Sequence, residues 1–169
     1  GYSVYFAESI DKMGDNIKEV KPHIMSVVPR LIEKVYDKIY DKGTSAGGLK
    51  SKIFLWALGV NKAKQKIGKP SGLMETIADK LVFSKWRDGL GGNIISLVSG
   101  SAALQPRLNK MFQNAGIPIL EGYGLTETSP VISVNSFGKI KVGTVGHVLE
   151  NLDVKIQEDG EITVKGPSV

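Results

Sequence analysis

The chain has 169 residues, which is the length of one domain or of part of a larger one. Hydrophobic residues make up 41% and charged residues 23%, so a disordered or fibrous chain is excluded. The absence of cysteine excludes disulfides, thiolate metal sites and cysteine catalysis. The net charge of +5 is too modest to indicate nucleic-acid binding, and no apolar stretch is long enough to span a membrane.

The first part of the chain predicts two strands and two helices. Residues 2–7 form an aromatic, β-branched run typical of a buried strand, and residues 15–20 predict a short helix. A second strand is expected over residues 23–28. Pro29 stops this strand and suits the first turn of a helix, which we expect to end at Gly43.

Two amphipathic helices are predicted next. Apolar residues at spacings of three and four predict a helix over residues 49–67, ended by Gly68 and Pro70. A further helix is expected over residues 73–86. The apolar stripes are Leu49, Ile53, Trp56, Val60, Ala63 and Ile67 in the first helix, and Leu73, Ile77 and Leu81 in the second.

Lysines gather in the same region. From Lys42 to Met74 there are seven lysines and no acidic residue. One hypothesis is that the basic helix over residues 49–69 meets an anionic membrane, where each basic residue contributes ~1 kcal/mol. The alternative is an ordinary amphipathic helix with a solvated basic face. A nucleic-acid surface is not expected, because no aromatic-rich or arginine-rich groove accompanies these lysines. Six of the seven lie in the basic helix: Lys50, Lys52, Lys62, Lys64, Lys66 and Lys69.

The second half of the chain predicts a mostly parallel sheet. An apolar strand over residues 94–98 runs into SGSAAL (99–104), and a helix follows with Pro106 near its start. The next strand begins at residues 118–120 and ends in EGYGLTETSP (121–130). Strand, helix and strand in this order predict an α/β fold whose sheet is mostly parallel and flanked by helices.

A small antiparallel β-region is expected after this sheet. Short β-rich runs separated by glycines follow Val131, and Asp159-Gly160 is a strong hairpin turn. We therefore expect residues 1–141 to belong to an α/β subdomain and residues 142–169 to begin a β-rich subdomain.

The residues that offer chemistry follow two of the predicted strands. Ligands of open α/β sheets bind beyond the carboxyl ends of the strands, so SGSAA and EGYGLTET are expected to open onto one crevice. Tyr123 offers a ring to stack on a base, Thr126 a hydroxyl for a phosphate oxygen, and Glu127 a hard oxygen ligand for Mg²⁺. The alternative is a turn with a packed ring, followed by a capping segment. His23 and His147 are expected to be structural.

At GYGLTET (122–128) the sequence resembles the adenylate-forming, or AMP-binding, superfamily, and within it the long-chain fatty-acid–CoA ligase branch. VPRLIEKVYDKI (28–39), SGSAAL (99–104) and GEITVKGPSV (160–169) are similar to further segments of that branch, in family order. The resemblance covers essentially the whole chain. It implies a fold like part of the N-terminal domain of an acyl-CoA synthetase.

The resemblance also implies roles for the two loops. The backbone of residues 101–103 would line adenine and the acyl pocket, and Tyr123 would stack on adenine. Thr126 and Glu127 would be the catalytic residues, with Thr126 on the α-phosphate and Glu127 holding Mg²⁺. The implied nucleotide-binding residues are Gly100, Ser101, Ala102, Ala103, Glu121, Gly122, Tyr123, Gly124, Leu125 and Thr126.

The implied reaction has two steps. The carboxylate of a long-chain fatty acid attacks the α-phosphate of ATP to give acyl-AMP and pyrophosphate, and the thiol of coenzyme A then displaces AMP. The implied partners are fatty acid, ATP and coenzyme A, with Mg²⁺ as cofactor and no nucleic acid. The implied location is cytoplasmic, including the periphery of a membrane.

The sequence also departs from the family pattern. Ser101 stands where many members have glycine. The family's phosphate loop is expected upstream of Gly1, and its ribose-binding Asp, hinge and lysine-bearing domain beyond Val169. We therefore expect a fragment that is inactive alone. The alternatives are a module that binds adenylate or a lipid surface without turnover, and a piece with no independent function.

Overall fold

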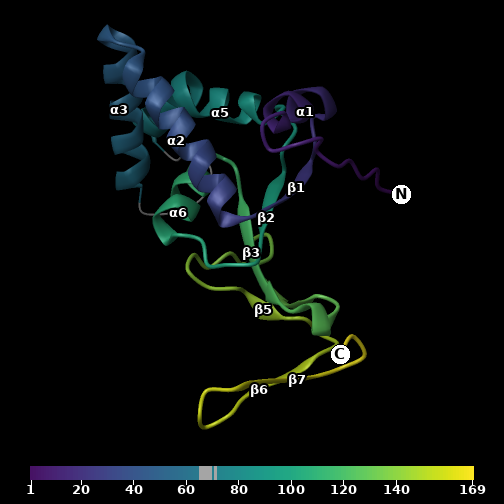
Figure 1. The fold of residues 1–169 in the computed structure, drawn as a ribbon. Helices are drawn as coiled ribbons and strands as arrows, with labels where there is room; N and C mark the ends of the chain where they lie inside the picture. The colour runs from purple at the N-terminus through teal and green to yellow at the C-terminus, as the bar shows by residue number, and fades with distance from the viewer. Residues whose placement is uncertain (65–69, 71) are drawn as a thin grey trace.

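A five-stranded mixed sheet organises the chain (Figure 1). The computed structural model describes residues 1–64, 70 and 72–169. The strands lie across the sheet in chain order, with β1, β2 and the first half of β3 parallel and with β4 and β5 antiparallel. The predicted α/β class and parallel strand pairs are confirmed. The strands are β1 (Ile24–Val27), β2 (Ser96–Ser99), β3 (Ile119–Gly124), β4 (Val131–Val134) and β5 (His147–Val148).

The helices gather at one end of the molecule, over the parallel strands (Figure 1). Their core is aromatic: the Trp86 ring lies 5.3 Å from the Phe83 ring and 5.7 Å from the Phe112 ring, measured between centroids. The helices are α1 (Met13–Val20), α2 (Pro29–Ser45), α3 (Gly48–Ala63), α4 (Leu73–Ala78), α5 (Ser84–Gly89) and α6 (Pro106–Asn114), with a π-helical turn, η1 (Asp79–Phe83), between α4 and α5.

The start of α2 is confirmed, but its end lies two residues beyond the predicted one. Pro29 is the first residue of α2, and the helix continues past Gly43 to Ser45. Gly43 lies against the ring of Phe54 in α3, where a Cβ would overlap the ring. The glycine therefore permits close packing of two helices and does not end one.

The strand predicted over residues 2–7 is wrong. No strand forms there, and Tyr2 and Phe6 are 99% and 91% exposed. Within the described residues β1 pairs only with β2, so the aromatic run has no strand beside it. Apolar residues form a strand only where a neighbouring strand supplies hydrogen bonds.

The predicted helix over residues 49–67 is confirmed only in part. α3 ends at Ala63, and Lys64 has an extended backbone. The residues that α3 buries are Phe54, Ala57, Leu58 and Asn61, whereas Leu49 of the predicted stripe is 72% exposed. Ile67, Lys66, Gly68 and Lys69 lie outside the described residues.

The predicted helix over residues 73–86 exists as three consecutive pieces, α4, η1 and α5. Its predicted stripe is on the outside: Leu73, Ile77 and Leu81 are exposed, while Ala78 and Trp86 are buried. A π turn holds one residue more than an α turn, so the helix face that meets the core changes where η1 begins.

The C-terminal hairpin is confirmed. β6 (Asp153–Ile156) and β7 (Ile162–Lys165) are antiparallel, and Asp159 Oδ1 accepts the Glu161 N–H at 3.0 Å in the turn between them. β5, at residues 147–148, still belongs to the larger sheet. The subdomain boundary expected at residues 141 and 142 stays a prediction.

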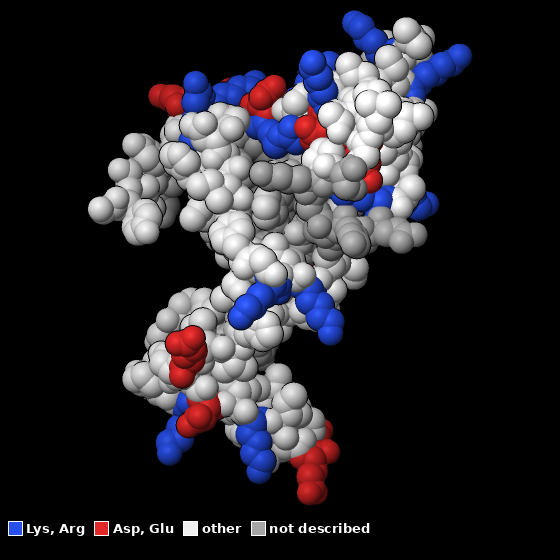
Figure 2. All heavy atoms as spheres, turned by 180° about the vertical axis from the view of Figure 1, so that it is seen from behind, with Lys and Arg blue, Asp and Glu red and all other residues white. Residues whose placement is uncertain are grey.

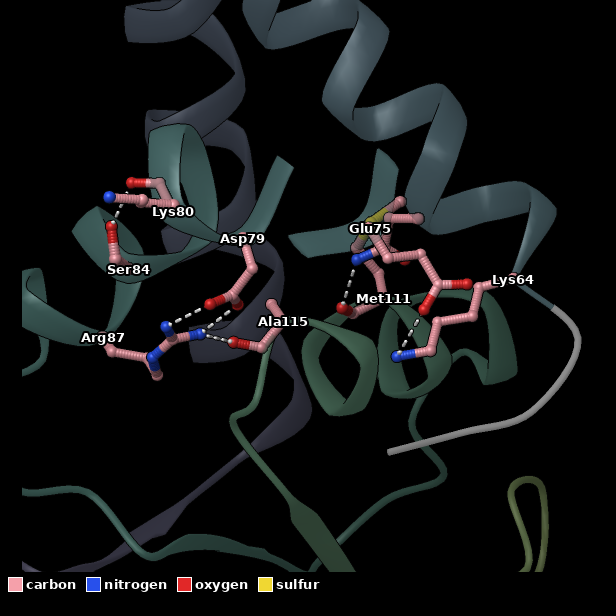
Figure 3. Close-up of polar contacts among 9 residues, drawn as sticks. Lys64, Glu75, Asp79, Lys80, Ser84, Arg87, Met111 and Ala115 are labelled. Atoms are coloured by element: carbon pink, nitrogen blue, oxygen red, sulfur yellow. Dashed lines mark hydrogen bonds and ion pairs between the residues drawn. The ribbon is translucent and has the colours of Figure 1, made fainter. Parts of the chain in front are cut away.

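Arg87 joins η1 to the end of α6 (Figure 3). Its Nη1 donates to Asp79 Oδ1 at 2.7 Å and to the Ala115 carbonyl at 2.6 Å, and its Nη2 donates to Asp79 Oδ2 at 2.9 Å. These bonds to Asp79 raise the pKa of Arg87 above its usual value, so the guanidinium stays charged. Arg87 therefore holds together two elements that are distant in sequence.

Replacing Arg87 with Lys is expected to lower the free energy of unfolding by about 1–2 kcal/mol. A lysine cannot make the two-pronged bond to Asp79 while also reaching the Ala115 carbonyl, although partial exposure of the pair limits the loss. Urea unfolding measures the change. The control is Arg30→Lys at an exposed position of α2, and equal midpoints for the two variants would contradict the expectation.

Candidate functional site

The candidate site lies at the carboxyl ends of β2 and β3, where their parallel pairing stops. Ser99, the last residue of β2, pairs with Glu121 of β3. The segment 100–104 follows β2 at this end of the sheet, and residues 122–128 follow Glu121 at the same end. The two segments that the sequence predicted to meet therefore start side by side.

The sequence suggested that the second segment is a loop from its start, but its first residues belong to β3. β3 continues through Gly122 and Tyr123 to Gly124, and these residues pair antiparallel with β4, with an irregularity between Tyr123 and Gly124. A Cβ at Gly124 would overlap the carbonyl oxygen of Pro130. The close approach of the two backbones therefore requires glycine at this position.

A short 3-10 turn, η2 (Thr126–Thr128), ends the segment. Thr128 is buried, and its hydroxyl accepts the Leu125 N–H at 3.0 Å and lies 2.9 Å from the Leu125 carbonyl oxygen. The capping role weighed for this segment thus belongs to Thr128. Thr126 and Glu127 are exposed, and within the described residues neither side chain has a hydrogen-bond partner.

The remaining side chains of this segment are also accessible. Tyr123 is 36% exposed and Leu125 is 48% exposed, so both residues are accessible in part. In the other segment Ser101, Ala102 and Ala103 are exposed. Ser101 has a φ of 69°, a left-handed conformation that favours glycine.

Glu121 differs from its neighbours because its carboxylate lies inside the protein. It is 5% exposed, accepts the Leu104 N–H at 3.3 Å and accepts a hydrogen bond from Asn109 Nδ2 at 2.5 Å. Asn109 and the nearby Gln113 were not predicted as site residues. Their only signal is the spacing of four residues on α6, a helix that also buries Leu108, Met111, Phe112 and Asn114.

Asn135 was not predicted as a site residue either. Its N–H donates to the Glu121 carbonyl at 2.9 Å and its Nδ2 to the Thr144 carbonyl at 2.6 Å, while its Oδ1 accepts the Lys141 N–H at 3.0 Å. Asn135 therefore fixes the turn after β4 against the middle of β3.

Neither the two histidines nor the segment 43–47 forms a site. His23 precedes β1 and His147 lies in β5, which are opposite edges of the sheet. The segment GTSAG (43–47) fits the GxSxG pattern of serine hydrolases. That pattern requires a strand before the serine, whereas Ser45 ends α2 and its hydroxyl donates to the Asp41 carbonyl at 2.6 Å.

The donor set at η2 fits a magnesium ion. Mg²⁺ prefers hard oxygen ligands and commonly uses one or two carboxylates together with substrate phosphates and water. Glu127 offers one exposed carboxylate beside the exposed hydroxyl of Thr126. Within the described residues no three His, Cys, Asp or Glu side chains gather as a metal cluster, so a fully protein-made cage is not the type of site these residues offer.

The site thus consists of two segments, 100–104 and 122–128, that start side by side at the carboxyl ends of β2 and β3. The family model for AMP-binding enzymes matches residues 1–169, and the chain belongs to this family. It is 36% identical over 171 residues to the long-chain-fatty-acid–CoA ligase FadD15 of Mycobacterium bovis, an alignment that covers 97% of this chain and 28% of that protein. It is 31% identical over 150 residues to long chain acyl-CoA synthetase 3 of Arabidopsis thaliana, covering 88% of this chain and 23% of that protein. The chain thus spans about a quarter of the length of these relatives.

Solved structures share the fold. An anthranilate CoA ligase, AuaEII, in complex with anthranoyl-AMP aligns with a TM-score of 0.58 at 16% identity, over 94% of this chain and 24% of that one. The long-chain-fatty-acid-CoA ligase FadD1 of Archaeoglobus fulgidus aligns with a TM-score of 0.54 at 14% identity, over 95% of this chain and 28% of that one. At these identities the likeness establishes the fold alone.

Proposed function

We propose that these residues form the adenylate-binding part of a longer long-chain fatty-acid–CoA ligase. One observation carries the proposal. Residues 100–103 and the segment with the exposed Tyr123, Thr126 and Glu127 both start at the carboxyl ends of the paired strands β2 and β3. The names of the curated relatives, which include long-chain fatty-acid and long-chain acyl-CoA ligases, support the substrate class. The relatives are about four times as long, and this length supports the proposal that the remaining machinery lies on a longer chain.

In this proposal each exposed group has one task. The ring of Tyr123 stacks on adenine, with the backbone of residues 100–103 against the opposite side of the nucleotide. The Thr126 hydroxyl donates to an oxygen of the α-phosphate, where negative charge builds up as the fatty-acid carboxylate attacks phosphorus and the bond to pyrophosphate breaks. Glu127 would hold Mg²⁺, which when bound neutralises phosphate charge. The thiol of coenzyme A then displaces AMP to form the thioester.

Fatty-acid-dependent ATP–pyrophosphate exchange by the full-length ligase tests this function. We expect exchange with palmitate and none without a fatty acid. Residues 1–169 alone are expected to give no exchange. Exchange at the same rate with and without fatty acid, or no exchange in either case, would contradict the proposed reaction.

The second candidate is a module that binds adenylate without turnover. Its support is the exposure of Tyr123 and of residues 101–103, which could hold a nucleotide without the rest of the machinery. Titration with AMP separates the two: the module predicts AMP binding by a full-length chain that never forms acyl-AMP, whereas the ligase predicts both.

We further propose a cytoplasmic ligase that contacts anionic membrane peripherally through α3. α3 carries Lys50, Lys52 and Lys62 and no acidic residue, and Figure 2 shows basic side chains at the helical end of the molecule, with acidic ones among them. Two nearby acidic groups have basic partners: Glu75 lies 3.6 Å from Lys64, and Asp79 binds Arg87 (Figure 3). Lys64 is buried and is not part of the basic surface predicted for it. In the described part of the chain no helix is long and apolar enough to cross a bilayer.

Changing Lys50, Lys52 and Lys62 together to Gln is expected to weaken binding of the full-length ligase to anionic vesicles by about 1 kcal/mol per lysine. Binding of the unchanged protein should fall steeply with salt, because exposed charges are screened over ~8 Å at physiological ionic strength. Vesicle co-sedimentation measures both effects. The control changes Lys139, Lys141 and Lys155 to Gln, and equal binding by the two triple variants would contradict a contact through α3.

A further inference from the structure

Glu121 stands where β3 exchanges one neighbour for another. Up to Glu121 the strand pairs with the parallel β2, and from Gly122 onward it pairs with the antiparallel β4. The Glu121 carbonyl accepts the Asn135 N–H, so its backbone is tied to the β4 side. Its side chain lies among residues of α6 and of the segment after β2. Glu121 therefore contacts the segment 100–104 and directly precedes the segment 122–128.

Both carboxylate oxygens of Glu121 are engaged inside the protein. Oε2 accepts the N–H of Leu104, the residue that ends the segment 100–104, and Oε1 accepts the side-chain amide of Asn109 on α6. The Asn109 side-chain oxygen in turn accepts Gln113 Nε2 at 2.7 Å. All three side chains are buried, and none of the ion pairs among the described residues includes Glu121. Amide groups alone thus satisfy this buried acid.

We infer that Glu121 is a positioning residue that fixes segment 100–104 against the segment carrying Tyr123, Thr126 and Glu127. The inference rests on the proposed adenylate site. It gives Glu121 a task other than nucleotide contact, because its two oxygens are used inside the protein and 5% of the residue is exposed. Asn109 sets the direction of the bond: its amide donates to Glu121 and its oxygen accepts from Gln113, so each group has one orientation.

This directionality allows a test by reversal. Asn109→Asp puts a second acceptor against Glu121, so a bond becomes a repulsion between two buried acids. Adding Glu121→Gln restores the bond in the opposite direction: the Gln amide donates to Asp at 109, its oxygen still accepts the Leu104 N–H, and Gln113 still donates to position 109. The double variant also has the same net charge as the unchanged protein.

The experiment uses the full-length ligase and two measurements, the dissociation constant for ATP and hydrogen exchange of the peptide containing residues 100–104 without nucleotide. Asn109→Asp is expected to weaken ATP binding about 10–100-fold and to speed exchange of this peptide about tenfold or more. The double variant is expected to return both values to within about threefold of the unchanged protein. Because the segment is displaced and not removed, KM for ATP should rise more than kcat falls.

Asn114→Asp is the matched control, a second buried asparagine on α6 whose amide donates to the Asn61 carbonyl and not to Glu121. It matches the cost of a new buried acid, but it should leave exchange of residues 100–104 unchanged. Equal effects of Asn109→Asp and Asn114→Asp on that peptide, or a double variant no better than Asn109→Asp, would overturn the inference. Failure of the unchanged ligase to bind ATP would refute the proposed function, and the exchange measurement would still decide whether Glu121 holds the segment.

Discussion

Replacing Glu127 with Gln in the full-length ligase is expected to lower the rate of acyl-adenylate formation about 10²–10³-fold. The change keeps the size of the side chain and removes its charge, so a divalent cation loses its anionic ligand. A loss of ~3–4 kcal/mol of transition-state stabilisation gives a rate effect of this size. Because Glu127 is exposed and has no partner among the described residues, the free energy of unfolding should change by less than ~0.5 kcal/mol.

A magnesium titration and a melting curve on the same preparation separate this role from a structural one. Raising Mg²⁺ should recover part of the lost rate, and the apparent affinity for Mg²⁺ measured with bound ATP should fall. Glu158→Gln makes the same chemical change at an exposed position near the hairpin turn and should alter neither value. An unchanged rate in Glu127→Gln would remove this residue from the site.

Replacing Gly124 with Ala is expected to disrupt the segment 122–128 and to abolish ATP binding. The new methyl group would overlap the Pro130 carbonyl oxygen, and backbone on both sides leaves no flexible side chain to move aside. Overpacking of this kind costs about 3 kcal/mol or more where it cannot relax. Urea unfolding together with ATP titration measures the two effects.

Gly59→Ala provides a control of opposite sign. Gly59 lies inside α3, and a Cβ there would meet no atom within 4 Å. Since alanine favours a helix over glycine by about 1 kcal/mol, this variant should be more stable than the unchanged protein. A stable Gly124→Ala protein that binds ATP normally would show that residues 124 and 130 can separate without cost.

The sequence predicts the parts of the fold that local patterns determine. β2, α6 and β3 follow from apolar runs bounded by turn residues, and their order gives the parallel sheet. The strand expected over residues 2–7 fails because composition cannot tell whether a neighbouring strand exists. The buried faces predicted for the helices 49–67 and 73–86 are wrong in part for another reason. Leu49 and Leu73 fit an apolar face, but packing against other helices decides which face is buried.

The candidate site shows the same division. Tyr123, Thr126 and Glu127 can be proposed from the sequence because they share one short segment whose residue types suit a nucleotide. The bond between Glu121 and Asn109 could not be proposed in this way. It joins residues twelve positions apart, and only the crossing of α6 over β3 brings them together.

The π turn η1 gives the helical region from Leu73 to Gly89 an unusual sensitivity to length. In a straight α-helix, residues 79 and 87 would lie about 12 Å apart along the axis, yet the Arg87 guanidinium reaches Asp79 with both nitrogens. The surplus residue in η1 also sets the direction in which Trp86 enters the core. Loss of a single residue between these two partners would turn the following helix by about 100°. In this region the number of residues is therefore constrained more strictly than the identity of exposed ones such as Leu81, and natural length variation should be absent here while substitutions accumulate.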